Sequence, residues 1–220
     1  FALVMMDRAT SWVEVHPSAR KSSEEVQKAF RTFQGYRDVI QFLYSDNAPE
    51  LIHAASCLGI CHDSSTPYNS PTNGIAERAI RKILDGTRTL LEQSGFGVAW
   101  WTWASRQFAA GINITKVDGV SPYHSRFRKN FGGLLVPFGA LIHARPPKPY
   151  LNLLPKMGAR SIPALFLGYN FAPGGHWRGE YWVAPLGDFE RSSPHTAVRM
   201  FKVKEVVFER NREVEFPLRA

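Results

Sequence analysis

Apolar and polar residues follow two different periods in the first 35 residues, which predicts two strands and then a helix. Residues 1–6 are a continuous apolar run and residues 12–17 alternate, as in a hairpin at one side of a sheet. Apolar residues then recur at helical spacing from Ser22, which forms a capping-box-like start together with Glu25. Gly35 ends this segment. The chain therefore begins in the order strand, strand, helix.

The pattern from residue 39 to residue 114 predicts further strands and helices in alternation. Asn73 stands in the N-cap position of the longest helix, and Gly95 ends that helix. This order of elements is that of an α/β domain. The predicted segments are a buried strand over 39–44 that leads to Asp46, a helix over 49–58, a strand or extended link over 60–65, a helix from Gly74 to about Ser94, and a buried helix from 99 to about 114.

The composition changes after Gly119. Prolines interrupt any helix as far as residue 160, and basic residues lie between them, so this stretch resembles a linker. Short strands are predicted beyond it, and Pro173, Gly174 and Gly175 form a strong hairpin signal between the first two. The expected parts are an α/β core over 1–115, a basic Pro-rich connector over 116–160, and a small β-rich segment over 161–220 with strands near 164–169, 179–184 and 201–208.

Composition places the chain among globular proteins with a polyanionic partner. Apolar residues make up 44% of the 220 residues, and the formal net charge is +8, which favours nucleic acid. No apolar run approaches the roughly 18 residues that a membrane span needs, and no signal peptide is present, so we expect no membrane partner. Cys57 and Cys61 do not form a disulfide framework, and their presence in one apolar segment predicts reduced, buried thiols inside the cell.

Asp46 and Glu77 are the candidate chemical groups. Asp46 follows a predicted central strand, and Glu77 lies near the start of a predicted helix. Carboxylates in these two places can converge on one pair of Mg²⁺ ions, as two-metal phosphoryl transfer requires, because hard cations prefer oxygen ligands. An isolated Asp or Glu in such positions is usually a polar turn or a solvated helix residue, so the joint context of the two residues supports the interpretation as a site.

Two stretches of the sequence carry a specific resemblance. Residues 44–50 (Tyr-Ser-Asp-Asn-Ala-Pro-Glu) and residues 65–78 (Ser-Thr-Pro-Tyr-Asn-Ser-Pro-Thr-Asn-Gly-Ile-Ala-Glu-Arg) closely resemble the catalytic core of Ty1/copia-type retrotransposon integrases. Residues 166–169 and 206–209 also resemble the segment that follows this core in copia-type Pol polyproteins. The resemblance implies an RNase H-like core, with a mixed five-stranded sheet and flanking helices, followed by the β-rich segment.

The resemblance also implies a function and a set of site residues. The function is DNA integration by a polynucleotidyl transferase, which processes the 3′ ends of the element's cDNA and transfers the strands into target DNA. Asp46 and Glu77 correspond to the second and third members of the DDE triad and are the implied ligands of Mg²⁺ or Mn²⁺. The expected partners are DNA and further copies of the chain, and the expected compartment is the nucleus. The residues expected to contact DNA are Tyr68, Asn73, Arg78, Arg81 and Lys82.

The first carboxylate of the triad is expected upstream of Phe1. In this fold the first Asp ends a strand that precedes two more strands and a helix, whereas only one strand separates Asp7 from the helix that begins near Ser22. Asp7 is therefore expected to stabilise a hairpin turn rather than to bind metal. Phe1 already lies inside a strand-like run, so we expect an N-terminally truncated fragment with impaired activity.

Other interpretations stay open at the level of sequence. His53 and Cys57 are one helical turn apart and could share a zinc ion, but Cys61 and His62 are adjacent and would point to opposite sides of a strand. Trp100, Trp101 and Trp103 could stack on bases, yet their helical spacing favours core positions. The alternative to an enzyme is a non-catalytic nucleic-acid-binding remnant of a retrotransposon polyprotein. A third possibility is an RNase H-like nuclease unrelated to transposition.

Overall fold

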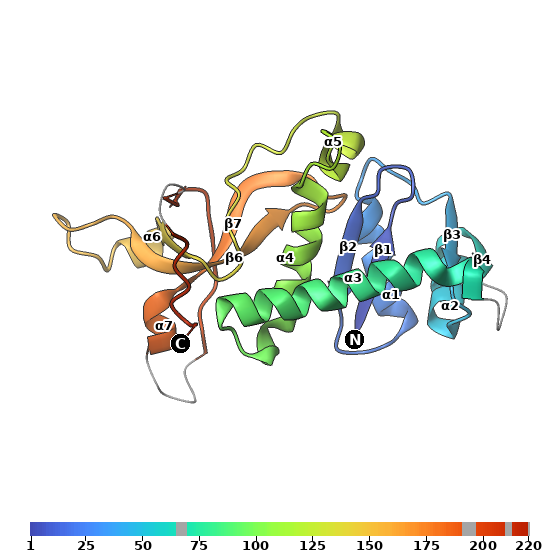
Figure 1. Ribbon diagram of the computed structural model, residues 1–220, viewed down its shortest axis with the longest axis horizontal. Coiled ribbons are helices and arrows are strands. Elements are labelled where there is room, and N and C mark those ends of the chain that lie inside the picture. The colour runs from blue at the N-terminus through green and yellow to red at the C-terminus, as the bar shows by residue number, and fades with distance from the viewer. Residues whose placement is uncertain (65–69, 191–196, 210–212, 220) are drawn as a thin grey trace. The chain divides into compact units, whose positions relative to one another are not determined.

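The computed structural model describes residues 1–64, 70–190, 197–209 and 213–219. The chain forms two compact units (Figure 1). Unit 1 comprises residues 1–86, 109–130 and 171–176, and unit 2 comprises residues 87–108, 131–170 and 177–220. The boundaries near residues 115 and 160 that the sequence suggests stay a prediction.

Unit 1 contains the elements that the sequence predicts for an α/β core. Its strands pair two by two: β1 with β2 in antiparallel fashion, and β3 with β4 in parallel fashion. The predicted α/β class is confirmed. The elements are β1 (Ala2–Met6), β2 (Val13–Pro17), α1 (Ser23–Gln34), β3 (Phe42–Ser45), α2 (Pro49–Leu58), β4 (Cys61–Ser64), the first part of α3 (Ser70–Ser94), the end of α4 (Trp101–Ile114) and α5 (Pro122–Phe127).

Helix α1 shows how the apolar pattern becomes packing. The Ser22 side chain accepts a hydrogen bond from the backbone N–H of Glu25, and Gly35 ends the helix with a positive φ of 66°. The buried residues of α1 recur at a helical period, and this face packs on α2 and β1 (Figure 1). These residues are Val26, Ala29, Phe30 and Phe33.

Two sets of contacts hold the β1–β2 hairpin to the rest of unit 1. The buried Asn113 side chain accepts a hydrogen bond from the backbone N–H of Val13 (2.9 Å) and donates one to the Val13 carbonyl (2.7 Å). Trp12, only 1% exposed, packs edge-on against Phe127 and Phe171. The backbone N–H and carbonyl of Val13 are both hydrogen-bonded to the Asn113 side-chain amide. Neither backbone group of Val13 is therefore left unpaired.

Two local predictions in unit 1 need correction. The strand before Asp46 is not buried: Phe42 and Tyr44 are 60% and 39% exposed. The reason is that β3 pairs with one neighbour, β4, within the described residues, so it lacks the cover of a central strand. Helix α3 begins at Ser70, three residues before the predicted cap, so Asn73 lies in its first turn and is not its N-cap.

Unit 2 is built on a five-stranded sheet with the order β8-β7-β6-β5-β9. The hydrophobic core beside the sheet includes Phe96, Phe138 and Leu167, and Trp100 and Trp103 pack partly buried against it, as the core interpretation predicts. The elements are the end of α3, η1 (Val98–Trp100), the start of α4, β5 (Leu141–Ala144), α6 (Lys148–Leu151), β6 (Ile162–Phe171), β7 (Trp177–Pro185), α7 (Leu186–Glu190), β8 (Phe201–Val203) and β9 (Val206–Val207).

The stretch expected to be a Pro-rich connector contains regular structure. Strand β5 pairs with both β6 and β9 inside the sheet of unit 2. The prolines do not prevent this, because Pro122 and Pro149 stand in the first turn of α5 and α6, where the missing N–H has no intrahelical acceptor. The signal for the hairpin turn is correct, since residues 172–176 connect β6 and β7.

Candidate metal and nucleic-acid site

Asp46 lies at the carboxyl end of a parallel strand pair in unit 1. Ser45, the last residue of β3, is in register with Ser64, the last residue of β4. Parallel strands end at the same edge of a sheet, so Asp46 follows β3 at the edge where β4 also ends. The Asp46 residue is exposed, and no hydrogen bond to its carboxylate occurs within the described residues.

Glu77 lies on α3, the helix that follows β4. It is the eighth residue of this helix and therefore about two turns from its start, not one turn as the sequence suggests. The side chain is exposed, whereas another face of the helix buries Ile83 and Thr87. An exposed carboxylate on the N-terminal third of α3 is available to bind a cation, and the buried face holds the helix in place.

The structure does not gather a complete metal cluster. Within the described residues, no group of three or more His, Cys, Asp or Glu side chains could hold a metal ion. Two exposed carboxylates of unit 1, Asp46 and Glu77, are the candidate ligands that remain. Thr66, Pro67 and Tyr68 lie outside the described residues, and so does the side chain of Asn73.

A cation that the sequence does not point to is influenced by the charge of Asp46. Lys21 forms an ion pair with Glu50, in the first turn of α2, with 2.9 Å between Nζ and Oε1. The Glu50 hydrogen bond and charge raise the pKa of Lys21, and the charge of Asp46 adds to this effect. Lys21 is 25 residues away from Asp46 in sequence, and only the packing of α1 on α2 reveals the proximity.

Asp7 ends β1 much as Asp46 ends β3, but its carboxylate is engaged in the hairpin turn. It accepts hydrogen bonds from the backbone N–H of Ala9 (3.0 Å) and from the Thr10 hydroxyl (2.5 Å). A guanidinium nitrogen of Arg126 lies 4.0 Å from the same carboxylate. These contacts agree with a structural role for Asp7 in the turn.

Arg126 is the second residue that the sequence does not single out. Its side chain is 7% exposed and donates hydrogen bonds to the Phe33 carbonyl (3.0 Å) and to Asp38 (2.8 Å). The guanidinium also lies over the rings of Trp12, Phe33 and Phe127, at 5.2 to 5.9 Å from their centroids. Arg126 thus links the end of β1 to the end of α1 within unit 1.

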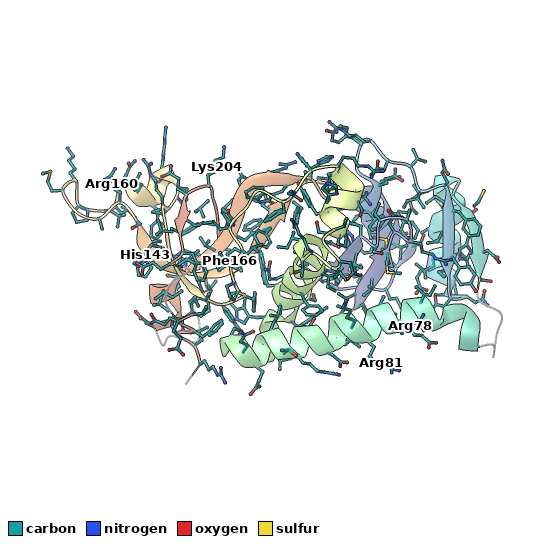
Figure 2. All side chains as sticks on the ribbon, turned by 45° about the horizontal axis from the view of Figure 1, so that its top comes forward. Arg78, Arg81, His143, Arg160, Phe166 and Lys204 are labelled. Atoms are coloured by element: carbon teal, nitrogen blue, oxygen red, sulfur yellow. The ribbon has the colours of Figure 1, made fainter. Side chains whose placement is uncertain are left out.

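The predicted DNA-contacting cations of α3 are exposed. Arg81 is one helical turn after Glu77 and so shares its face, while Arg78 and Lys82 lie one turn apart on the adjacent face. Figure 2 shows Arg78 and Arg81 on α3. No ion pair within the described residues engages these three cations. Their position agrees with a contact to a polyanion, which stays a prediction.

The possible zinc ligands do not converge. The Nδ1 atom of His53 lies 3.8 Å from the Cys57 sulfur and 2.8 Å from the Ser23 hydroxyl. His62 contacts Ser45 instead, at 2.8 Å. The expectation of buried thiols is wrong, because Cys57 and Cys61 are both exposed: Cys61 lies on an outward position of β4, a strand whose residues alternate between exposed and half-buried.

Comparison with known proteins shows which proteins this chain resembles. No family model matches the chain. The chain is 26% identical over 190 residues to the retrovirus-related Pol polyprotein from transposon RE1 of Arabidopsis thaliana, a match that covers 77% of the chain and 12% of that protein. It is 29% identical over 140 residues to the corresponding protein from transposon RE2, covering 60% of the chain and 9% of that protein. This chain is therefore similar to retrotransposon Pol polyproteins.

The relationship confirms the resemblance to a Ty1/copia-type retrotransposon integrase, although this Pol-related chain spans only about a tenth of the length of the curated relatives it matches. Among solved structures, the catalytic core domain of BIV integrase is similar, with a TM-score of 0.42 and 22% identity over 55% of this chain and 81% of that one. A simian T-cell lymphotropic virus intasome in complex with the PP2A regulatory subunit B56 gamma is also similar, with a TM-score of 0.46 and 17% identity over 92% of this chain and 70% of that one. Both TM-scores are below 0.5, so the assignment rests on the Pol polyproteins.

No helix in the described ranges is both long enough and apolar enough to cross a membrane.

Proposed function

We propose that this Pol-related chain takes part in DNA integration, as the segment that processes the 3′ ends of a retrotransposon's cDNA and joins them to target DNA. The observation that carries the proposal is the pair of exposed carboxylates, Asp46 after β3 and Glu77 on α3, in a chain related to Pol polyproteins. In this proposal both side chains hold a divalent cation, Mg²⁺ or Mn²⁺.

The two carboxylates fit such an ion. Both are exposed, and Mg²⁺ is commonly held by one or two carboxylates together with substrate phosphates and water. When bound, the ion polarises the phosphodiester and lowers the pKa of the attacking water. The residues of the chain do the rest: Asp46 and Glu77 fix the position of the ion, and Arg81, one turn beyond Glu77, neutralises a neighbouring phosphate.

Two successive displacements follow from this arrangement. In the first, water attacks a phosphodiester near the cDNA end and releases a free 3′-hydroxyl. In the second, that 3′-hydroxyl attacks a phosphodiester of the target, forming the new bond as a target 3′-hydroxyl leaves. The same carboxylates serve both displacements, and no covalent bond to the protein forms. The proposed partners are therefore the cDNA ends, target DNA and further copies of the chain, and the proposed compartment is the nucleus.

One observation favours a second candidate, a non-catalytic nucleic-acid-binding remnant. A DDE site needs three carboxylates, and no group of three metal-binding side chains occurs within the described residues. We therefore expect residues 1–220 alone to join DNA strands weakly. The two candidates differ in whether Asp46 and Glu77 bind a metal ion at all.

The test combines metal binding with strand joining. Binding of Mn²⁺, followed by electron paramagnetic resonance, is measured for the chain and for its Asp46→Asn and Glu77→Gln variants. Joining of a pre-cut DNA end to a plasmid in Mg²⁺ is measured on the same proteins. Glu92→Gln is the matched control, because Glu92 is another exposed glutamate of α3.

The proposal expects both site variants to lose Mn²⁺ binding and any joining activity, with Glu92→Gln unchanged. Mn²⁺ binding that survives both substitutions would reject Asp46 and Glu77 as ligands and leave the remnant as the better account. Robust joining by the unmodified chain would instead show that its carboxylates suffice, which would contradict the expected impairment.

A further inference from the structure

Helix α2 of unit 1 presents two metal-binding side chains that the strand-transfer site does not use. His53 and Cys57 are four residues apart on this helix, so they lie one above the other on the same face. Both residues are exposed. Another face of α2 buries Leu51, Ala54 and Ala55. The packing of that buried face holds the helix, and with it the exposed pair, in place.

The distance between these two side chains suits a shared metal ion. The Cys57 sulfur lies 3.8 Å from Nδ1 and 3.9 Å from Nε2 of the His53 ring. Zinc binds a thiolate sulfur at about 2.3 Å and an imidazole nitrogen at about 2.0 Å, so two such ligands of a tetrahedral site are about 3.6 Å apart. A shift of a few tenths of an ångström therefore brings the pair to the separation that one zinc ion requires.

A residue of the neighbouring helix orients the imidazole. The hydroxyl oxygen of Ser23, the first residue of α1, lies 2.8 Å from Nδ1 of His53. When Nδ1 carries the ring proton and donates it to this oxygen, the lone pair of Nε2 is left for a metal ion. Metal-binding histidines usually have their other ring nitrogen hydrogen-bonded in this way, which fixes the tautomer and the orientation of the ring. Ser23 is thus a positioning residue for the pair.

One chain supplies only half of a structural zinc site. Such sites are almost always four-coordinate, and in the part of the chain that the structure describes no third metal-binding side chain joins the pair. Cys61 and His62 lie on β4, where His62 contacts Ser45 instead. The other two ligands have to come from elsewhere, and a second copy of the chain carries the same pair.

We propose that two copies of the chain bind one Zn²⁺ ion between their α2 helices, each copy contributing His53 and Cys57. A two-fold axis through the ion brings the same surface of both copies together and completes a set of two thiolates and two imidazoles. These ligands in a tetrahedral arrangement favour zinc over hard cations such as Mg²⁺. Each thiol releases its proton to solvent as the zinc–sulfur bond forms.

The surface around the pair suits the close approach of a second copy. Ile52, which is 42% exposed, and the small residue Ser56 are the other exposed residues on this face of α2. The face carries no charged side chain of its own helix, because the single charged residue of α2 is Glu50 in its first turn. Two α2 helices can therefore meet without opposing like charges from these helices, and Ile52 adds an apolar contact.

The experiment measures zinc stoichiometry and molecular mass on the whole chain. Titration calorimetry gives the number of Zn²⁺ ions per chain, and light scattering after gel filtration gives the mass with and without Zn²⁺. Co²⁺ serves as the spectroscopic probe, because its visible absorption distinguishes a tetrahedral site containing sulfur from an octahedral site of oxygen ligands. A phosphine reductant prevents disulfides, and excess Mg²⁺ occupies exposed carboxylates such as Asp46 and Glu77.

Five single variants test the assignment of the ligands. Cys57→Ser and His53→Gln each remove one ligand, and Ser23→Ala removes the hydrogen-bond partner of Nδ1. The matched controls are Cys61→Ser and His143→Gln, because Cys61 and His143 are exposed at other places on the chain.

We expect one Zn²⁺ ion per two chains and a doubling of the mass on addition of zinc, both reversed by EDTA. Cys57→Ser and His53→Gln should lose the doubling and the Co²⁺ absorption of a thiolate site. Ser23→Ala should bind zinc about tenfold more weakly, and both controls should behave as the unmodified chain. One zinc ion per chain without a change of mass, or a doubling that survives Cys57→Ser, would overturn the proposal.

This inference names one contact for the further copies of the chain in the proposed function, but it does not rest on the strand-transfer carboxylates. The double variant Asp46→Asn with Glu77→Gln should still double its mass with zinc. Loss of the doubling in this variant would assign the zinc to those carboxylates and contradict the α2 site. Loss of Mn²⁺ binding alone would concern only the strand-transfer site, so the two proposals can fail separately.

Discussion

Asp7 and Asp46 occupy equivalent places in two strand pairs of unit 1, yet their surroundings differ. Each follows an apolar strand, β1 or β3, at its carboxyl end. The Asp7 carboxylate accepts two hydrogen bonds from its own turn and lies beside Arg126. Among the residues that the structure describes, no such partner holds Asp46, and the nearby charge of Lys21 is paired with Glu50. A carboxylate bound by its own turn serves the fold, and an unengaged one can serve a ligand.

The two cations near these aspartates, Arg126 and Lys21, also differ in how deeply they are buried and in how many groups they contact. Arg126 is nearly buried and donates to a backbone carbonyl as well as to a carboxylate, so its loss would leave several groups unpaired. The Lys21 side chain is 60% exposed and its partner is one carboxylate. Water can replace the contact of Lys21 more readily than the contact between the nearly buried Arg126 guanidinium and the Phe33 carbonyl.

The largest expected effect concerns metal binding. Asp46→Asn should abolish Mn²⁺ binding, whereas Asp7→Asn should leave Mn²⁺ affinity within about twofold, because the Asp7 oxygens are already occupied by the turn. Titration calorimetry with Mn²⁺ on both variants checks this. If Asp7→Asn removed metal binding as well, the two carboxylates would share one site and the contrast between them would fail.

Removal of Arg126 should have the largest effect on stability. Arg126→Met keeps the apolar stem but removes the donor to the Phe33 carbonyl and to Asp38, and the positive charge beside Asp7, so we expect a loss of about 2 kcal/mol in the free energy of unfolding. Urea denaturation measures the loss. Lys129→Met, three residues further along at an exposed position, is the control and should change little. A loss below about 1 kcal/mol would show that the buried guanidinium is dispensable.

Substitution of Asp7 should lower the stability of the fold more than substitution of Asp46, which is the reverse of their expected order for metal binding. Asp7→Asn weakens the hydrogen bonds from Ala9 and Thr10, for an expected loss of about 1 kcal/mol. Asp46→Asn should stay within about 0.5 kcal/mol of the unmodified chain, because its carboxylate holds no hydrogen bond within the described residues. Thermal unfolding of both variants without metal gives this difference directly, and equal losses would contradict it.

Local signals in the sequence predict much of this molecule because they act over a few residues. Ser22, Gly35 and Gly59 set helix ends, and the alternation in residues 12–17 marks β2. The burial of β3 could not be predicted, since it depends on which strands pair and not on how apolar Phe42 and Tyr44 are. The roles of Lys21 and Arg126 could not be predicted from the sequence either, because each is 29 or more residues away from its ion-pair partner and meets it only through packing.

The smallest expected effect belongs to the ion pair beside Asp46. The hydrogen bond from Lys21 lowers the pKa of Glu50 below its usual 4.5. A carboxylate with a lowered pKa in the folded state contributes stability above its unfolded pKa and loses it as the pH falls through the folded value. Glu50→Gln should therefore lower the melting temperature by about 1 °C or less at pH 7, since exposed pairs contribute little. The difference should vanish once the pH drops well below 4.5, where both proteins are neutral at this position. A difference that persisted at low pH would mean that Glu50 acts through its shape in the first turn of α2, and that Lys21 is held beside Asp46 by something other than charge.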